Sequence, residues 1–181
     1  MQKSAFKYFL YIIIAFSAIG TACNTDDPFR IPPPDLSSVP EPFDLQNIEP
    51  EEIIPGVQVY IHEEGFGPYY VTARDEVWIY KTLRTDEGVI IYSTFSDNRV
   101  DPIPISMSIA GNYQNVFNFT ILLGYNPGFK SGILGMKEGE KRTIVVQPEQ
   151  GFRNVPSSSM NAAYRENTLI YDIRVSRIEP S

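Results

Sequence analysis

Aromatic side chains, rather than metal ligands or nucleophiles, are the chemistry that this sequence offers. The 181-residue chain contains one cysteine, Cys23, and one histidine, His62, but 11 tyrosines and 11 phenylalanines. A single histidine argues against a catalytic triad or a histidine metal site, and a single cysteine argues against a zinc site built from several cysteines. We therefore expect no metal and no cofactor, and we look for a function that aromatic side chains can perform.

The charge balance is acidic, with 15 Lys and Arg residues against 22 Asp and Glu residues and a formal net charge of −7. Affinity for nucleic acid depends on clustered Lys and Arg side chains, and the sequence contains no such run. Nucleic acid is therefore not an expected partner. The length allows one ordinary domain with appendages.

A compact helix-to-strand unit lies at residues 127–148. Pro127 suits the first turn of a helix, where its missing N–H has no cost. Apolar residues then recur at spacings that share one helical face, namely Phe129, Ile133 and Met136. Gly139 marks a turn, and residues 143–147 are β-branched enough to form a strand. The pattern predicts a short helix followed directly by a strand.

This unit resembles the helix-to-strand signature of FKBP-type peptidyl-prolyl isomerases. The matching positions are Gly128, Phe129, Gly132, Met136, Gly139, Lys141 and Pro148. The resemblance covers residues 56–178 and implies an α+β fold, an FKBP-like antiparallel β-sheet wrapped around one short α-helix. It also implies proline-containing polypeptides as substrates, and we expect a monomer.

Short apolar or alternating segments predict the strands of this sheet. They are residues 57–61, 71–84, 89–95, 143–147 and 168–175, with a hairpin turn at residues 85–88. Two further candidates, residues 101–110 and 115–123, compete for one strand of the family pattern. Spacing alone does not decide between them, and the other segment is expected to be an insertion.

The resemblance also implies a set of pocket residues. The expected catalytic residues are Tyr80, Ile91, Tyr92, Phe129, Phe152 and Tyr171, with Phe129 as the floor of the pocket. The expected substrate-binding residues are Tyr125, Asn126, Ile105 and Met107, with the Asn126 N–H donating to the bound carbonyl. Residues 117–119 are the alternative to Ile105 and Met107.

Five of these positions depart from the family pattern: Phe129 stands where a tryptophan is usual and Tyr171 where a phenylalanine is usual, and the other three are as follows. Tyr92 stands where an aspartate is usual, Ile91 where a phenylalanine is usual, and Phe152 lacks a tyrosine hydroxyl. Polar groups that orient the substrate are thereby lost, which predicts reduced activity.

The N-terminus has the layout of an export signal. Lys3 and Lys7 precede an apolar run at residues 9–19, which is shorter than the roughly 20 residues that a membrane-spanning helix needs. The residues that follow, Gly20 to Cys23, are similar to a bacterial lipobox. We therefore expect a signal peptide at residues 1–22 and lipidation of Cys23.

Residues 24–55 contain eight prolines and many acidic residues. Such a composition disfavours helix and sheet. We predict that residues 23–55 form a lipidated, Pro-rich tether and that residues 56–181 form the FKBP-like domain. The expected location is the bacterial cell envelope, at the outer membrane rather than the inner, on the periplasmic or surface face.

Two functions of different classes fit these patterns. The first is a membrane-anchored prolyl isomerase that assists the folding of exported proteins. The second is a catalytically weak or inactive module of the same fold that binds a protein partner in the envelope.

Overall fold

One antiparallel sheet and one short helix form the core of the computed structural model, which describes residues 32–108 and 125–181. The chain divides into two units, Met1–Pro33 and Pro34–Ser181, and every element named below belongs to the second. In chain order the elements are β1 (Glu51–Ile54), β2 (Val57–Glu63), β3 (Glu76–Thr85), β4 (Ile90–Ser93), the 3₁₀ turn η1 (Ser96–Asn98), β5 (Ile103–Ser106), α2 (Pro127–Ile133), β6 (Lys141–Val146), the 3₁₀ turn η3 (Met160–Tyr164) and β7 (Leu169–Glu179).

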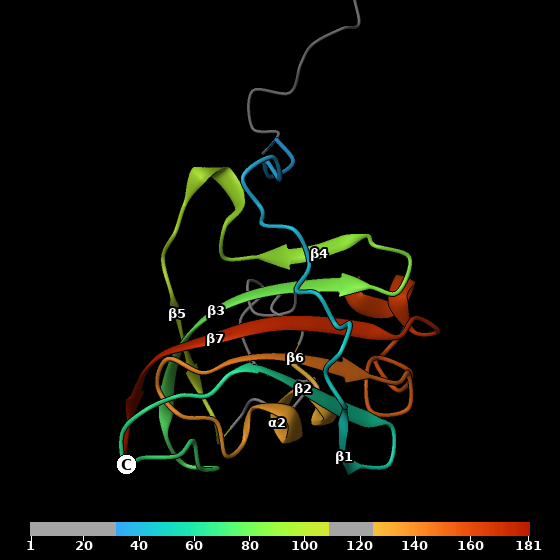
Figure 1. Cartoon of the computed structure of the whole chain (residues 1–181). Coiled ribbons are helices and arrows are strands. Elements are labelled where there is room, and N and C mark those ends of the chain that lie inside the picture. Colours follow the sequence, from blue (N-terminus) through green and yellow to red (C-terminus); the bar gives the residue numbers. More distant parts are fainter. Residues whose placement is uncertain (1–31, 109–124) are drawn as a thin grey trace, which may run out of the picture. The chain divides into compact units, whose positions relative to one another are not determined.

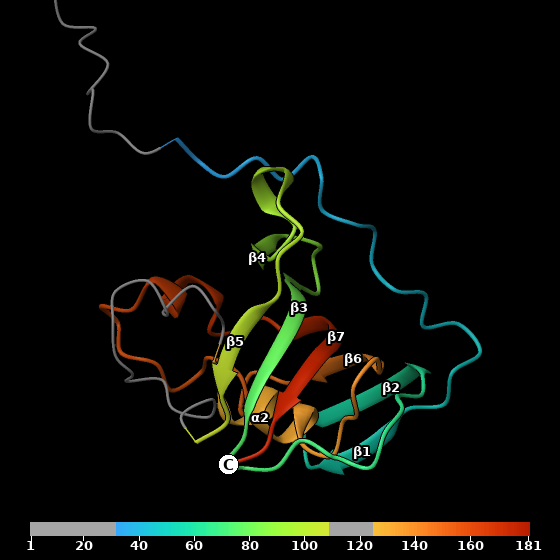
Figure 2. The ribbon, with the colours of Figure 1, turned by 90° about the vertical axis from the view of Figure 1, so that its left-hand side faces the viewer.

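The strands are ordered β1-β2-β6-β7-β3-β4, and β5 also pairs with β3. Strand β3 therefore has β7 on one edge, while its other edge pairs with β5 over its first half and with β4 over its second half. Figure 1 shows α2 against one face of this sheet, and Figure 2 shows the sheet from its β5 side. The predicted fold, a sheet wrapped around one short helix, is confirmed.

Two glycines allow α2 to pack closely on the sheet. A Cβ atom at Gly128 would lie 2.3 Å from a methyl carbon of Val146, and one at Gly132 would lie 2.4 Å from a methyl carbon of Ile144. Both distances are far below van der Waals contact, so any larger residue would force the helix away from β6. The glycine spacing of the signature therefore sets the distance between helix and sheet.

The predicted strands and helix largely match the observed ones. The helix begins at Pro127 as expected but ends at Ile133. Met136 therefore lies in the loop after the helix, and its side chain is buried in the core. Of the two competing segments, residues 103–106 form β5, as expected for one of them. The alternative strand at residues 115–123, with the candidate pocket residues 117–119, lies outside the described residues.

The segment before β2 is more ordered than a tether. Residues Glu51–Ile54 form β1, which pairs with β2, so the expectation that this Pro-rich stretch forms no sheet is wrong there. Farther upstream, the Pro40 carbonyl accepts a hydrogen bond from Arg84, and the Phe43 ring lies 4.9 Å from the His62 ring. These contacts attach the segment around Pro40 and Phe43 to the sheet face opposite α2, which we call the outer face.

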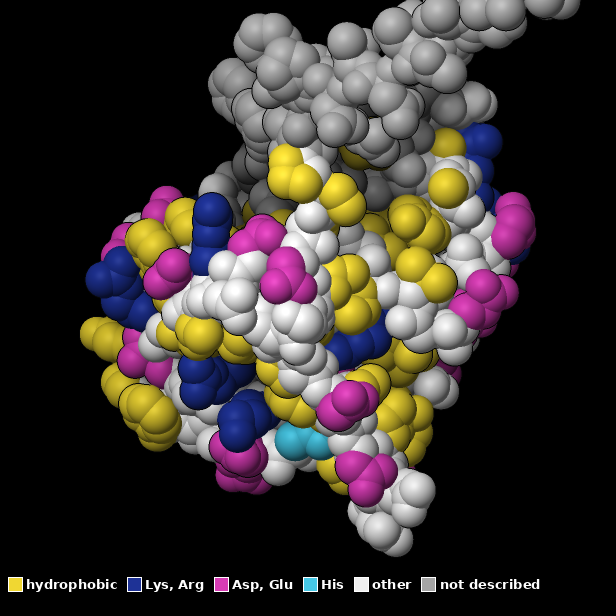
Figure 3. Space-filling view, turned by 90° about the horizontal axis from the view of Figure 1, so that it is seen from above, with side chains coloured by type: hydrophobic (Ala, Val, Ile, Leu, Met, Phe, Trp, Pro, Cys, Tyr) yellow, Lys and Arg dark blue, Asp and Glu magenta, His cyan; other side chains and the backbone are white. Residues whose placement is uncertain are grey.

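Figure 3 views the molecule from above Figure 1, and acidic and basic side chains are interspersed with hydrophobic ones on this side. Among the described residues, no helix is long and apolar enough to cross a bilayer.

Candidate active site

Asn126 and Phe129 form the centre of the candidate site at the start of α2. The Asn126 side-chain oxygen accepts a hydrogen bond from the Phe129 N–H at 2.8 Å and so caps the helix. The Asn126 amide nitrogen donates to the Tyr171 hydroxyl at 2.5 Å. One side chain therefore connects the helix start to strand β7 and fixes both relative to the Phe129 ring.

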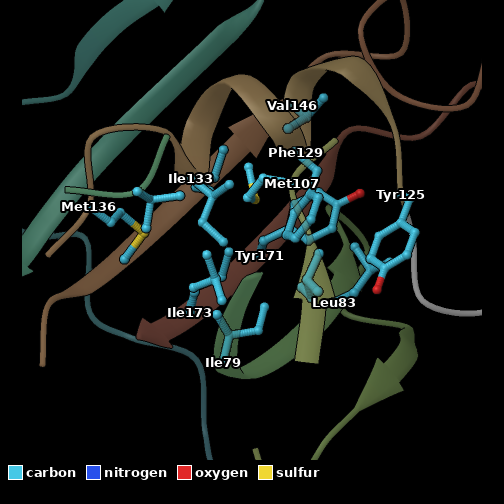
Figure 4. Packing of buried hydrophobic residues seen from close by; sticks show 14 of the residues in the cluster. Ile79, Leu83, Met107, Tyr125, Phe129, Ile133, Met136, Val146, Tyr171 and Ile173 are labelled. Atoms are coloured by element: carbon cyan, nitrogen blue, oxygen red, sulfur yellow. The ribbon is translucent and has the colours of Figure 1, made fainter. Parts of the chain in front are cut away.

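Three aromatic rings meet at this point. The Phe129 ring centroid lies 5.1 Å from that of Tyr171 and 5.8 Å from that of Tyr125, within the range for favourable aromatic pairs. Figure 4 shows these rings close together, with Met107 beside Phe129 and Leu83 below them. Phe129 and Tyr171 have no exposed surface, so they also belong to the hydrophobic core.

Strand β3 contributes Lys81 to the same pocket. Its side chain is fully buried, and its Nζ lies 4.8 Å from the Phe129 ring centroid and 5.2 Å from those of Tyr92 and Tyr125. Burial disfavours the charged amine and lowers the pKa of Lys81 to about 7. The aromatic pocket therefore contains an amine that titrates near neutral pH.

Tyr80 does not line this pocket. It faces the outer side of the sheet, where its ring stacks on Phe95 at 5.7 Å and the Arg174 guanidinium carbon lies 4.3 Å from its centroid. Adjacent residues of a strand point to opposite faces, so Tyr80 and Lys81 cannot both face Phe129. On β3 it is therefore Lys81, and not Tyr80, that faces the Phe129 ring.

Tyr92 and Ile91 come from β4 and are half-buried against the core. The Tyr92 ring, at the position of the missing aspartate, faces the Lys81 amine. Burial raises the pKa of the Tyr92 phenol, and burial together with the Tyr92 charge raises that of Tyr125. Both phenols therefore stay neutral at physiological pH.

The remaining predicted residues lie in the core cluster that contains Phe129. Phe152, Ile105 and Met107 have at most 1% of their surface exposed. Ile105 lies on β5 opposite Val77 of β3, and Met107 follows the strand. The structure thus brings all predicted pocket residues except Tyr80 into one cluster or its border, while Cys23 lies outside the described residues.

Lys81 was missed from the sequence, although one signal could have identified it. Val77 and Ile79 are buried at alternate positions of β3, so the next residue on their face is Lys81. Among the described residues, no group of three or more His, Cys, Asp or Glu side chains is placed to hold a metal ion.

A family model for FKBP-type peptidyl-prolyl cis-trans isomerases matches residues 72–176. This chain belongs to the FKBP family. A comparison with curated protein sequences finds no match. The match runs from β3 into β7 and includes every predicted site residue that the structure describes.

Solved structures of the FKBP fold are similar to this chain. The N-terminal domain of FKBP42 from Arabidopsis thaliana matches with a TM-score of 0.53 at 18% identity, over 79% of this chain and 99% of that domain. A peptidyl-prolyl cis-trans isomerase from Pseudomonas syringae matches with a TM-score of 0.54 at 15% identity, over 72% of this chain and 81% of that protein. The fold is thus that of FKBP isomerases.

Proposed function

We propose that this FKBP-type peptidyl-prolyl cis-trans isomerase acts on proline-containing segments of exported proteins while a lipid on Cys23 anchors it to the membrane. The proposal of catalysis rests on the contacts among Asn126, Phe129 and Tyr171, which we call the aromatic frame. The Asn126 side chain bonds to the Phe129 N–H and to the Tyr171 hydroxyl, which supports a fixed position for the two rings on which the substrate would bind.

This frame suits the chemistry of prolyl isomerisation. The uncatalysed barrier is about 20 kcal/mol and comes from the partial double bond of the amide. Neither a nucleophile nor a metal is needed, because an apolar pocket that binds the twisted amide better than the planar one lowers the barrier. The prolyl ring would lie on Phe129, with Tyr171, Phe152 and Ile91 as walls and the Asn126 N–H as donor to the carbonyl.

A binding module without catalytic activity is the second candidate. Lys81 and Tyr92 favour it, because a buried amine and a bulky phenol occupy the positions next to the Phe129 ring. Such a module would hold a partner through the same fold without accelerating isomerisation.

Exchange NMR separates these two functions. The rate of cis/trans exchange in an Ala-Leu-Pro-Phe peptide is measured with micromolar full-length chain in uncharged detergent micelles. We expect clear acceleration, and Phe129→Leu should reduce kcat/KM by about tenfold or more because the floor of the pocket is lost. The matched control is Phe66→Leu, since the Phe66 side chain is 68% exposed and should leave the rate unchanged. Well-folded protein that gives no acceleration would support the binding module.

The anchoring part needs a separate test. Bacteria that express the chain are grown with radiolabelled palmitate, and their membranes are separated on a density gradient. We expect label in the protein, recovery with the outer-membrane fraction, and loss of both with Cys23→Ala. A soluble, unlabelled wild-type protein would refute the anchor while leaving the isomerase proposal untouched.

A further inference from the structure

The outer face of the sheet contains a cavity that the isomerase proposal does not use. Its volume is about 190 Å³, and it lies between β3, β7 and the segment around Pro40 and Phe43. Tyr80 of β3 and Arg174 of β7 line it, and they are cross-strand neighbours on this face. The sheet itself therefore separates the cavity from the Phe129 ring.

The walls of the cavity are mainly apolar, and the fold holds them in place. The Tyr80 ring stacks on the Phe95 ring at 5.7 Å, and Pro40 and Phe43 complete the apolar part of the lining. The Pro40 carbonyl accepts a hydrogen bond from Arg84, which fixes this wall to β3. A dry cavity of about 150 Å³ is enough to hold benzene, so this one has room for one apolar side chain with a small polar group.

Arg174 gives the cavity a positive charge that has no carboxylate of its own. Its guanidinium carbon lies 4.3 Å from the Tyr80 ring centroid, and it forms no ion pair with any residue in the ranges 32–108 and 125–181. Lys141 of β6 is its direct cross-strand neighbour, and two like charges placed side by side cost stability. Arg174 is exposed, so an anion can reach its N–H donors and offset this repulsion.

The other charged side chains around the cavity restrict the ligand to a single negative charge. Arg84 and Asp172 neutralise each other, and Lys141 forms an ion pair with Glu63 at 2.7 Å. Glu41 also lines the cavity and repels anions, more strongly those of higher charge. A phosphate is therefore disfavoured relative to a carboxylate, whose two oxygens match the fork of one guanidinium.

We infer that this cavity binds the C-terminal residue of a polypeptide when that residue is apolar. Its side chain would lie against the rings of Tyr80, Phe95 and Phe43. Its carboxylate would accept two hydrogen bonds from Arg174, and because this residue is exposed the preceding polypeptide can extend into solvent. The site does not depend on the proposed function, since it requires neither a proline nor the Phe129 ring.

Chemical-shift titrations of the full-length chain in uncharged micelles test this site. The probes are N-acetyl-Ala-Ala-Phe with a free C-terminal carboxylate and the same peptide with a C-terminal amide. We expect the acid to bind about tenfold more tightly than the amide, because only the acid pairs with the Arg174 guanidinium. The shift changes should centre on Thr82 and Phe95, which line the cavity, and not on Phe129.

Arg174→Gln removes the charge and keeps a polar side chain. It should weaken binding of the acid by about tenfold, to the level of the amide. Arg177→Gln is the matched control. The guanidinium carbon of Arg177 also lies over a ring, that of Trp78 at 4.9 Å, but this arginine is paired with Glu179 and does not line the cavity. This variant should bind the acid as tightly as the wild type.

Three results would overturn the inference. They are equal binding of the acid and the amide, a preference for the acid that persists in Arg174→Gln, and no binding of either peptide at millimolar concentration. Binding of N-acetylphenylalanine without binding of the tripeptide acid would also refute it, because the ligand would then be a small acid and not a polypeptide. The probes contain no proline, so none of these results depends on whether the chain is an active isomerase.

Discussion

The two faces of strand β3 each bury a charged side chain, and they treat it differently. On the outer face, Arg84 forms an ion pair with Asp172 at 2.7 Å, and Asp172 also accepts a hydrogen bond from Thr143 at 2.7 Å. On the inner face, Lys81 lies among aromatic rings. The outer charge is paired with a carboxylate, whereas the inner charge lies over the faces of aromatic rings.

The difference separates a charge that is fixed from one that titrates. A buried ion pair with further hydrogen bonds holds its neighbours in one arrangement and changes little with pH. An amine whose pKa is lowered to about 7 changes its charge within the physiological range. The following predictions test this contrast.

The largest change in the free energy of unfolding is expected for the ion pair on the outer face. Asp172→Ala should lower the free energy of unfolding by about 3–5 kcal/mol, because it leaves the Arg84 guanidinium buried beside the Pro40 carbonyl without its carboxylate. Urea unfolding followed by circular dichroism measures the change. The double variant Asp172→Leu with Arg84→Met should recover much of the loss, and a single variant as stable as the wild type would contradict the structural role of this pair.

On the inner face, the stability should depend on pH through Lys81. Between about pH 7 and pH 9 the unfolded chain keeps a proton that the folded chain has released, so the free energy of unfolding should increase with pH by about 2 kcal/mol. Urea unfolding at several pH values measures this slope. Lys81→Met should flatten it, and a wild-type curve that falls over this range would show that the buried amine stays charged.

A smaller loss of stability is expected when the hydrogen bond between Asn126, at the helix start, and Tyr171 of β7 is removed. Tyr171→Phe removes the hydroxyl that accepts from the Asn126 side chain, which should cost about 1 kcal/mol and lower Tm by about 3 °C. Calorimetry measures the change. Tyr69→Phe, at a side chain that is 60% exposed, is the control and should leave Tm unchanged. An equal shift in both variants would refute a specific role for the Tyr171 hydroxyl.

The smallest change in stability is expected for an ion pair at the surface. Lys141 and Glu63 form an ion pair at 2.7 Å, but the Glu63 side chain is 58% exposed. Lys141→Met should therefore change the free energy of unfolding by less than about 0.5 kcal/mol. A loss comparable to that of Asp172→Ala in the same urea assay would show that burial does not explain the contrast between charges.

The helix and most strands could be predicted because their signals are local. Pro127 at the helix start, the glycines of the signature and the alternation of residues 168–175 each act within a few residues of chain. Strand β1 was not predictable in this way. Four residues next to several prolines carry little propensity of their own, and pairing with β2 stabilises them.

The structure brings the predicted site residues together except for Tyr80, which lies one position away from the residue that faces Phe129. The motif placed Tyr80 at the wall, but the register of β3 with β7 and β4 turns Lys81 inward. Side chains alternate between the two faces of a strand. A family motif matched one residue too early or too late therefore places its residues on the wrong face of the sheet. Asn126, Phe129 and Tyr171, which the motif also named, do contact one another in the structure.

The sequence by itself determined the family, the helix-to-strand unit and the aromatic residues of the pocket, since these depend on residue type and short spacing. Only the tertiary structure decided that Lys81 lies among the aromatic rings and that the segment around Pro40 and Phe43 lies against the outer face. Both depend on contacts between segments far apart in the chain. The position of the buried amine among the rings follows from that packing.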